Sequence, residues 1–129
     1  MTNAGERVAT FRKERQRQNA RIAELQHLGI NRFFRLDSAA YEDGPLPGRT
    51  KELLGLVASL VLRCDDCVTY HLDQCVAAGW TDEEIADALN VGLVVGGSIV
   101  IPHLRRAVDT LDAIRAEHDA KASQEGDGR

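Results

Sequence analysis

Apolar residues recur along most of this chain at intervals of three and four residues, and no stretch alternates apolar with polar residues. Intervals of three and four place side chains on one face of an α-helix, whereas alternation is typical of strands. The helices predicted from this pattern cover residues 6–28, 31–41, 50–62, 64–79, 81–95 and 99–120. We therefore expect an all-α fold, a compact bundle of about six helices.

The predicted helix over residues 50–62 is apolar around almost its whole circumference. Its apolar residues are Leu53, Leu54, Leu56, Val57, Leu60 and Val61. A helix that is apolar on every side is typically central in a bundle, where each of its faces can be buried. The few polar positions on this helix therefore need a reason, and Glu52 is the acidic one among them.

Several residues mark the predicted helix ends. Gly29 is a natural stop for the first helix. Thr81, followed three residues later by Glu84, forms a capping box at the start of another helix. The pair Gly96–Gly97 interrupts the chain before the last helix. The apolar anchors expected for the helix over residues 31–41 are Phe33, Phe34 and Leu36.

These elements divide the chain into a basic helical segment (residues 1–45), a core domain (residues 46–120) and a tail (residues 121–129) that we expect to fray. The formal net charge is −4, but it is unevenly distributed. The first 35 residues carry eight Lys or Arg and three Asp or Glu, a net +5, so the remainder carries −9. We expect the basic helix to lie on an acidic body or on a neighbouring subunit.

Charge and hydropathy exclude two classes of partner. Apart from Phe11, no aromatic residue lies within the basic helix predicted over residues 6–28, and no nucleic-acid-binding motif follows it. We therefore expect no nucleic-acid partner. No apolar run is long enough to cross a bilayer and the first residues lack an apolar signal region, so we expect no membrane partner and a cytoplasmic location.

The strongest chemical signal lies between Cys64 and His71. Cys64 and Cys67 are three residues apart, and His71 follows Cys67 at four, which places these last two on one face of a helix. Two thiols with a base beside them are the minimum equipment for redox or peroxide chemistry. In a reducing compartment such a pair is more often catalytic or metal-binding than a structural disulfide.

The reactivity of Cys67 depends on opposing effects. A free cysteine has a pKa of about 8.5, which a helix N-terminus and a nearby imidazolium both lower. Asp65 and Asp66 act in the other direction, because negative charge disfavours a thiolate. Glu52 could set the balance, either as a proton acceptor or by orienting His71. The sequence does not decide which effect prevails.

The spacing of Cys64, Cys67, His71 and Cys75 also raises the possibility of zinc binding. On a continuous helix Cys67 and Cys75 would lie about 12 Å apart. Zinc ligands lie about 2.0–2.3 Å from the metal, so one ion cannot reach both cysteines. We therefore expect no metal and no cofactor, and we interpret Cys75 as a small core residue. Nothing in the sequence identifies a chemical partner for His103 or His27.

At these residues the chain resembles the carboxymuconolactone decarboxylase and alkylhydroperoxidase D family. Glu52, Cys64, Cys67 and His71 match the E-x11-C-x2-C-x3-H motif of its hydroperoxidase branch. The segment Gly79–Ile85, the following Gly-Gly pair and a final helix are also similar, so the resemblance covers about residues 46–111.

This resemblance implies an all-α homo-oligomer, a trimer or a hexamer, with the site near subunit contacts. It implies that Cys67 attacks a peroxide, that Cys64 resolves the product as a disulfide, and that Glu52 and His71 relay protons. A dithiol protein or a small thiol would then restore the pair. Asp66 stands where the family often has a histidine, and this difference bears on how strongly Cys67 is activated.

The sequence thus favours a thiol-dependent peroxidase or disulfide reductase. One alternative is a decarboxylase or isomerase of a lactone or another small organic acid, with Glu52 and His71 as general acid and base. True lactone decarboxylases of the family generally lack the cysteine pair, which weighs against this alternative. The non-enzymatic alternative is a redox-sensing or metal-binding helical module.

Overall fold

The computed structural model describes residues 3–127 and is all-α over that range, as predicted. Its helices are α1 (Ala4–Glu24), α2 (Leu28–Ala40), α3 (Gly48–Val61), α4 (Asp65–Ala77), α5 (Asp82–Gly96), the 3-10 helix η1 (Ser98–Val100) and α6 (Ile101–Asp127). None of the helices in this range combines the length and the apolar composition needed to cross a membrane.

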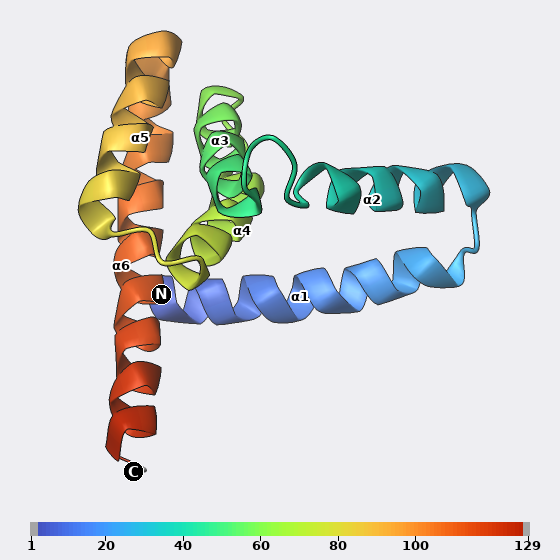
Figure 1. The fold of residues 1–129 in the computed structure, drawn as a ribbon, viewed down its shortest axis with the longest axis horizontal. Helices are drawn as coiled ribbons and strands as arrows, with labels where there is room; N and C mark the ends of the chain where they lie inside the picture. Colours follow the sequence, from blue (N-terminus) through green and yellow to red (C-terminus); the bar gives the residue numbers. More distant parts are fainter. Residues whose placement is uncertain (1–2, 128–129) are drawn as a thin grey trace.

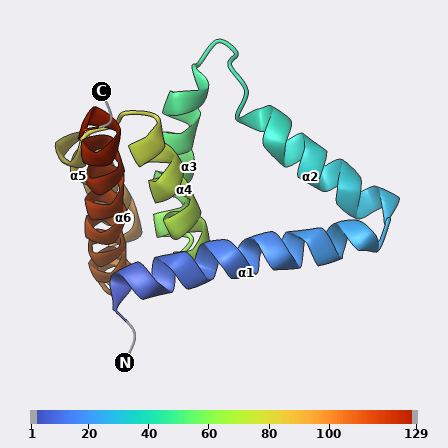
Figure 2. The ribbon, with the colours of Figure 1, turned by 90° about the horizontal axis from the view of Figure 1, so that it is seen from below.

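Helices α3 to α6 form the body of the molecule, and α1 and α2 form an arm that projects from it (Figures 1 and 2). The largest fully buried side chains are Leu56, Leu60, Leu72, Ile85, Leu89, Val76, Val100 and Cys75. Leu56 and Leu60 lie on α3, which packs against both α4 and α5. The predicted central position of this helix is confirmed only in part, because Leu54 on the same helix is 53% exposed.

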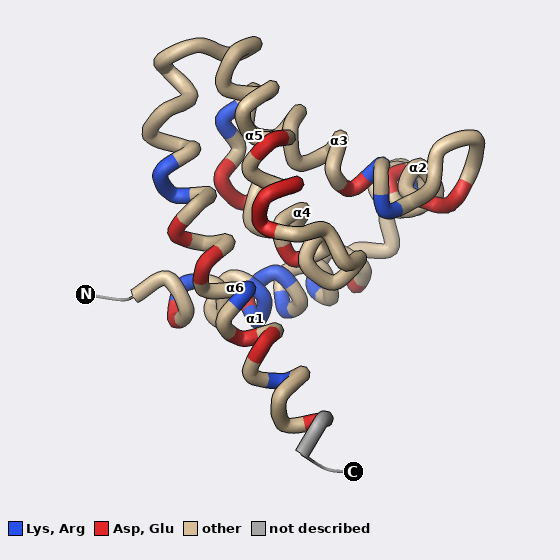
Figure 3. Tube along the Cα trace, turned by 60° about the vertical axis from the view of Figure 1, so that its left-hand side comes forward, with Lys and Arg blue, Asp and Glu red and all other residues tan. Residues whose placement is uncertain are grey.

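Ion pairs with acidic residues of α4 and α6 hold the first half of α1 on the body. Figure 3 shows where the basic and acidic residues lie along these helices. The guanidinium of Arg12 donates to Asp73 on α4 (Nε–Oδ2, 2.9 Å) and to Glu117 on α6 (Nη1–Oε2, 2.7 Å). Arg7 donates to Asp109, also on α6, at 2.9 Å. The expectation that the basic helix lies on an acidic body is confirmed for this part of α1.

Helix α2 makes little contact with the rest of the chain and buries none of its residues. Phe33 is 67% exposed and Leu36 is 68% exposed, so the prediction that the apolar residues of this segment anchor it within the chain was wrong. The reason is visible in Figure 2, where α2 runs along the outside of the arm and no other helix covers it. Its apolar face is therefore open to solvent in the single chain.

The predicted stop at Gly29 was also wrong. Helix α1 ends at Glu24, and the chain then turns at Gln26, whose φ of 50° is incompatible with continuing a helix. The side chain of His27 caps α2, because its Nδ1 accepts a hydrogen bond from the backbone N–H of Ile30 at 3.2 Å. Gly29 consequently lies in the first turn of α2, and His27 has a structural role.

The boundaries of the later helices follow the sequence more closely. The capping box of Thr81 and Glu84 is present in both directions, at 3.1 Å and 3.0 Å. Gly97, with a φ of 81°, separates α5 from η1 and α6 as predicted. The predicted end of the last helix at residue 120 was wrong, because α6 continues to Asp127. The rest of the tail expected to fray, residues 128–129, lies outside the described residues, and the division into three parts stays a prediction.

Candidate active site

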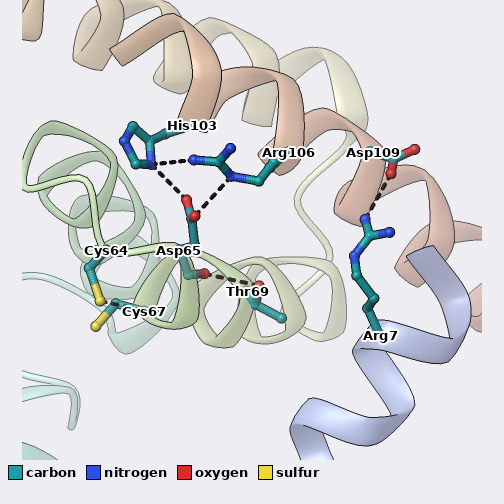
Figure 4. A network of polar contacts seen from close by, with 8 residues as sticks. All are labelled: Arg7, Cys64, Asp65, Cys67, Thr69, His103, Arg106 and Asp109. Carbon is teal, nitrogen blue, oxygen red and sulfur yellow. Dashed lines mark hydrogen bonds and ion pairs between the residues drawn. The ribbon is translucent and has the colours of Figure 1, made fainter. Parts of the chain in front are cut away.

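The two cysteines lie at the start of α4, directly after the short turn that follows α3. Arg63 adopts a φ of 60°, which ends α3 and leaves Cys64 as the N-cap of α4. The Sγ of Cys64 accepts a hydrogen bond from the backbone N–H of Cys67 at 3.3 Å. It thus takes the part that a serine or aspartate oxygen usually plays at a helix start. Both cysteines are free thiols, and their side chains lie next to each other (Figure 4).

Glu52 on α3 and His71 on α4 form a buried pair. The Nδ1 of His71 lies 2.8 Å from Oε2 of Glu52, and their side chains are only 9% and 13% exposed. An ionised carboxylate can only accept a hydrogen bond, so beside it Nδ1 is the donor, and the form of the ring that can act as a base has its lone pair on Nε2. The predicted pairing of these two residues is confirmed, whereas their catalytic roles stay a prediction.

Tyr41, the C-cap of α2, completes this group and was missed by the sequence reasoning. Its hydroxyl lies 3.4 Å from Nε2 of His71, and the two ring centroids are 5.4 Å apart. Tyr70 packs its ring against His71 from another side, edge to face at 5.2 Å. No motif or periodicity marks Tyr41, because it lies 30 residues before His71 and meets it only through the fold.

Gly55 on α3 provides the space for this arrangement. A Cβ at that position would lie 2.6 Å from Cε1 of His71 and 2.8 Å from the hydroxyl of Tyr41. Such distances are shorter than carbon atoms tolerate, so any side chain at residue 55 would displace the imidazole or the phenol. A glycine within a strongly apolar helix was the available sequence signal for a close approach at this point.

Cys67, His71 and Tyr41 line one open cavity of about 460 Å³. The residues around it are Phe11, Glu14, Arg15, Gln18, Asp37, Tyr41, Asp66, Cys67, Tyr70 and His71. Glu52 and Cys64 are not part of this lining. Glu52 contacts His71, which lines the cavity, and Cys64 lies beside Cys67, which also lines it.

The environment of Cys67 raises its pKa to about 11. Partial burial of the thiol is the main cause, followed by the hydrogen bond with Cys64. The negative charges of Asp66 and Asp37 act in the same direction. The effects that disfavour a thiolate thus outweigh those that favour it, and Cys67 keeps its proton at neutral pH. Any nucleophilic chemistry at this sulfur requires a base that removes the proton during the reaction.

Asp65, the other aspartate of the motif, faces α6 (Figure 4). Its Oδ1 lies 2.8 Å from Nδ1 of His103, and its Oδ2 accepts from Nε of Arg106 at 2.9 Å. His103 therefore has a partner that the sequence did not identify. Through these contacts the start of α4, which carries both cysteines, is tied to α6.

Cys75 is fully buried in the core, as predicted, and burial raises its pKa to about 12. It is separated from the cavity that Cys67 lines. Within residues 3–127 no three side chains of His, Cys, Asp or Glu converge so that they could hold a metal ion.

Comparison with known proteins defines the family. The model of the carboxymuconolactone decarboxylase family matches residues 30–110, a span that contains Tyr41, Glu52, both cysteines of the motif and His71. The uncharacterized protein H16_B0147 of Cupriavidus necator is 30% identical over 103 residues, which cover 80% of this chain and 91% of that protein. The chain therefore belongs to the carboxymuconolactone decarboxylase family.

Solved structures agree with this assignment. The crystal structure of TM1620 from Thermotoga maritima is 54% identical, with a TM-score of 0.83 over 87% of this chain and 95% of that one. TM1620 is described as a member of the same family with a suggested involvement in the antioxidative response. The apo structure of lpg0406 from Legionella pneumophila, also of this family, is 26% identical, with a TM-score of 0.73 over 86% and 96% of the two chains.

The space at Gly55 can be tested by Gly55→Ala. Alanine favours a helix over glycine by about 1 kcal/mol, but overpacking in a tight site typically costs about 1–3 kcal/mol. We expect Gly55→Ala to lower the free energy of unfolding, measured by urea denaturation. The matched control is Gly5→Ala, where a Cβ would make only an ordinary 3.4 Å contact with Asn3, and we expect a small gain in stability. Equal stabilisation by both substitutions would show that residue 55 has room for a side chain.

The raised pKa of Cys67 predicts a shifted pH profile for alkylation. In a Cys64→Ser background, iodoacetamide should modify Cys67 with a midpoint well above the value of about 8.5 for a free cysteine, because burial still opposes the thiolate. Adding Asp66→Asn should lower the midpoint by about half a pH unit, since it removes one partly screened negative charge. Asp112→Asn, which lies at a different cavity, should leave it unchanged. A midpoint at or below 8.5 would contradict this description of the thiol.

Proposed function

We propose that this protein is a thiol-dependent peroxidase or disulfide reductase in which Cys67 is the reacting thiol and Cys64 its partner. One observation carries the proposal: Cys67 lines the same cavity as His71, which is held by Glu52, while Cys64 lies directly beside Cys67. A thiol, a base and a second thiol are the groups that peroxide reduction through a disulfide requires. The suggested antioxidative involvement of TM1620, which is 54% identical, supports it.

The proposed cycle has three steps. A peroxide oxygen forms a bond to the sulfur of Cys67 while the O–O bond breaks, which gives a sulfenic acid and releases an alcohol or water. The sulfur of Cys64 then attacks that of Cys67, a disulfide forms and water leaves. A dithiol protein or a small thiol finally reduces the disulfide by exchange.

The raised pKa of Cys67 gives the Glu52–His71 pair its part in this cycle. Because the resting thiol keeps its proton, the attack on the peroxide must be coupled to proton removal. His71 with a free Nε2 is the base in the cavity, and the carboxylate of Glu52 stabilises the imidazolium that forms.

The charges of the cavity favour uncharged substrates. Three carboxylates, those of Glu14, Asp37 and Asp66, line it together with one guanidinium, that of Arg15. Arg15 lies over the ring of Tyr70, 4.3 Å from its centroid. A peroxide that carries its own carboxylate would meet net negative charge here. Hydrogen peroxide and small neutral alkyl hydroperoxides are therefore the appropriate test substrates.

The decisive test is peroxide consumption in the presence of a dithiol. Cys67→Ser should abolish turnover, because it removes the reacting sulfur. Cys64→Ser should still reduce one equivalent of peroxide but stop at a sulfenic acid that dimedone traps. Cys75→Ala, which changes only a core thiol, should leave turnover intact. In the wild type, one equivalent of peroxide should remove two of the three titratable thiols. Unchanged turnover in Cys67→Ser would exclude this assignment.

A second candidate follows from the buried Glu52–His71 pair, which could serve as acid and base without any thiol. In that case the chain would act on a lactone or another small organic acid, as the family name suggests. Turnover of such a compound by a Cys64→Ser/Cys67→Ser double variant would favour this function. Reversible disulfide formation without turnover of either kind of substrate would favour a redox-sensing module.

We also propose that the protein is a homo-oligomer in which a second copy covers the apolar face of α2. Phe33 and Leu36 are each about two-thirds exposed, which is unusual for such large apolar side chains in clusters. The net charge of +5 over the first 35 residues and −9 over the rest lets the arm of one copy meet the body of another. The family resemblance gives a trimer or a hexamer as the expected size.

Light scattering after size-exclusion chromatography tests the oligomer. Phe33→Asp/Leu36→Asp should reduce the mass towards that of one chain, because it places charges in the proposed interface. Glu83→Lys, a surface change on α5 in the body, serves as a control and should leave the mass unchanged. A wild-type mass equal to one chain, about 14.2 kDa, would contradict the proposal.

A further inference from the structure

The hydroxyl of Tyr41 lies 3.4 Å from Nε2 of His71, and Tyr41 lines the same cavity as Cys67. We propose that Tyr41 passes the proton between Cys67, His71 and the departing oxygen of the peroxide. This inference rests on the proposed peroxidase function and adds a residue to it that lies outside the E-x11-C-x2-C-x3-H motif.

The direction of the hydrogen bonds follows from Glu52. In the form of His71 that can act as a base, Nδ1 donates to Glu52 and Nε2 has a lone pair, so the hydroxyl of Tyr41 donates to Nε2. The oxygen of Tyr41 then keeps its own lone pairs free to accept a proton from the cavity. A chain from Glu52 through His71 to Tyr41 therefore leads from a buried carboxylate to the cavity that Cys67 lines.

The contact between Tyr41 and His71 is long, at 3.4 Å, for a hydrogen bond from a hydroxyl. Catalytic hydrogen bonds are often long in the absence of substrate and shorten in the reacting complex. The close approach is nevertheless built into the fold, because Gly55 leaves the space that both rings occupy. Burial, and then the negative charges of Asp37 and Glu52, raise the pKa of Tyr41. The phenol consequently keeps its proton at rest. It can accept one proton and donate another without becoming a phenolate.

The step balances without a further reactant. The thiol proton of Cys67 moves to the oxygen of Tyr41 while the phenolic proton moves to Nε2 of His71. The sulfur then bonds to the terminal peroxide oxygen, and the O–O bond breaks. The departing alkoxide takes a proton from Tyr41, which recovers its own from His71. The products are a sulfenic acid on Cys67 and an alcohol.

The other groups of the cavity are less suited to this role. Tyr70 meets His71 with the edge of its ring, and the guanidinium of Arg15 covers its face. Asp37 and Asp66 also line the cavity, but no hydrogen bond links them to His71 within the described residues. Of the two tyrosines, only Tyr41 joins the imidazole to the cavity through its hydroxyl.

The test compares Tyr41→Phe with Ser98→Ala, which removes an exposed hydroxyl on η1 outside this cavity, in single-turnover oxidation of the full-length reduced protein. The rate constant for Cys67 is measured with tert-butyl hydroperoxide, whose leaving alkoxide needs a proton, and with uncharged peracetic acid, whose leaving acetate does not. We expect Tyr41→Phe to slow the reaction with the alkyl hydroperoxide about 100-fold, within the usual range for general acid–base catalysis. The loss with the peracid should be smaller, because there Tyr41 assists only the deprotonation of Cys67. Ser98→Ala should change both rate constants less than twofold.

The outcomes separate this inference from the proposed function. An equal loss with both oxidants in Tyr41→Phe would mean that the hydroxyl does not protonate the departing oxygen, and it would overturn the inference. Unchanged rate constants in Tyr41→Phe would do the same while leaving the peroxidase assignment in place. If neither oxidant reacts with Cys67 of the wild type, the proposed function fails and the role of Tyr41 fails with it. Thermal unfolding of each variant checks that the fold is retained.

Discussion

The hydrogen bond between Glu52 and His71 is the contact on which the site depends. A carboxylate and an imidazole that are each nearly nine-tenths buried are expensive to remove from water, and they are tolerated here because each satisfies the other. The bond joins α3, the central helix, to α4, which carries the cysteines, so it fixes the orientation of the two helices at the cavity. It also fixes which nitrogen of the ring faces Tyr41. The same hydrogen bond thus sets the packing of α3 against α4 and the orientation of the imidazole in the site.

This interaction is all the more important because the thiol is not activated in advance. The start of a helix and an imidazole usually make a cysteine acidic, but partial burial and the neighbouring carboxylate of Asp66 outweigh them at Cys67. A thiol with a raised pKa has little thiolate at neutral pH, so its nucleophilic chemistry depends on a base that takes its proton. Asp65 has a different task from Asp66, since it holds the start of α4 on α6 through His103 and Arg106. The two adjacent aspartates therefore have different surroundings: Asp66 lines the cavity of Cys67, and Asp65 binds residues of α6.

The sequence was informative wherever a feature is local. The capping box at Thr81 and the break at Gly97 depend on residues a few positions apart, and both were found. The pairing of Glu52 with His71 was anticipated from an acidic residue on an otherwise apolar helix, and the family motif then supplied its spacing from the cysteines and His71. The contact of Tyr41 with His71 was not predicted, because the two residues lie 30 positions apart. The contact of His103 with Asp65 was not predicted for the same reason, since these residues lie 38 positions apart. Such pairs arise from how helices pack, which periodicity does not specify.

The errors concerning α2 have a different origin and bear on function. Apolar spacing was interpreted as evidence for burial within the chain, yet α2 leaves Phe33 and Leu36 exposed. The same helix ends at Tyr41, so a weakly held element delivers a hydroxyl to the imidazole. Gly55 provides the space for Tyr41 beside His71, but little else in this chain holds α2 in place. A second copy on the apolar face of α2, as proposed above, would therefore also steady the hydroxyl of Tyr41 against the imidazole, and assembly and reactivity would be linked through one helix.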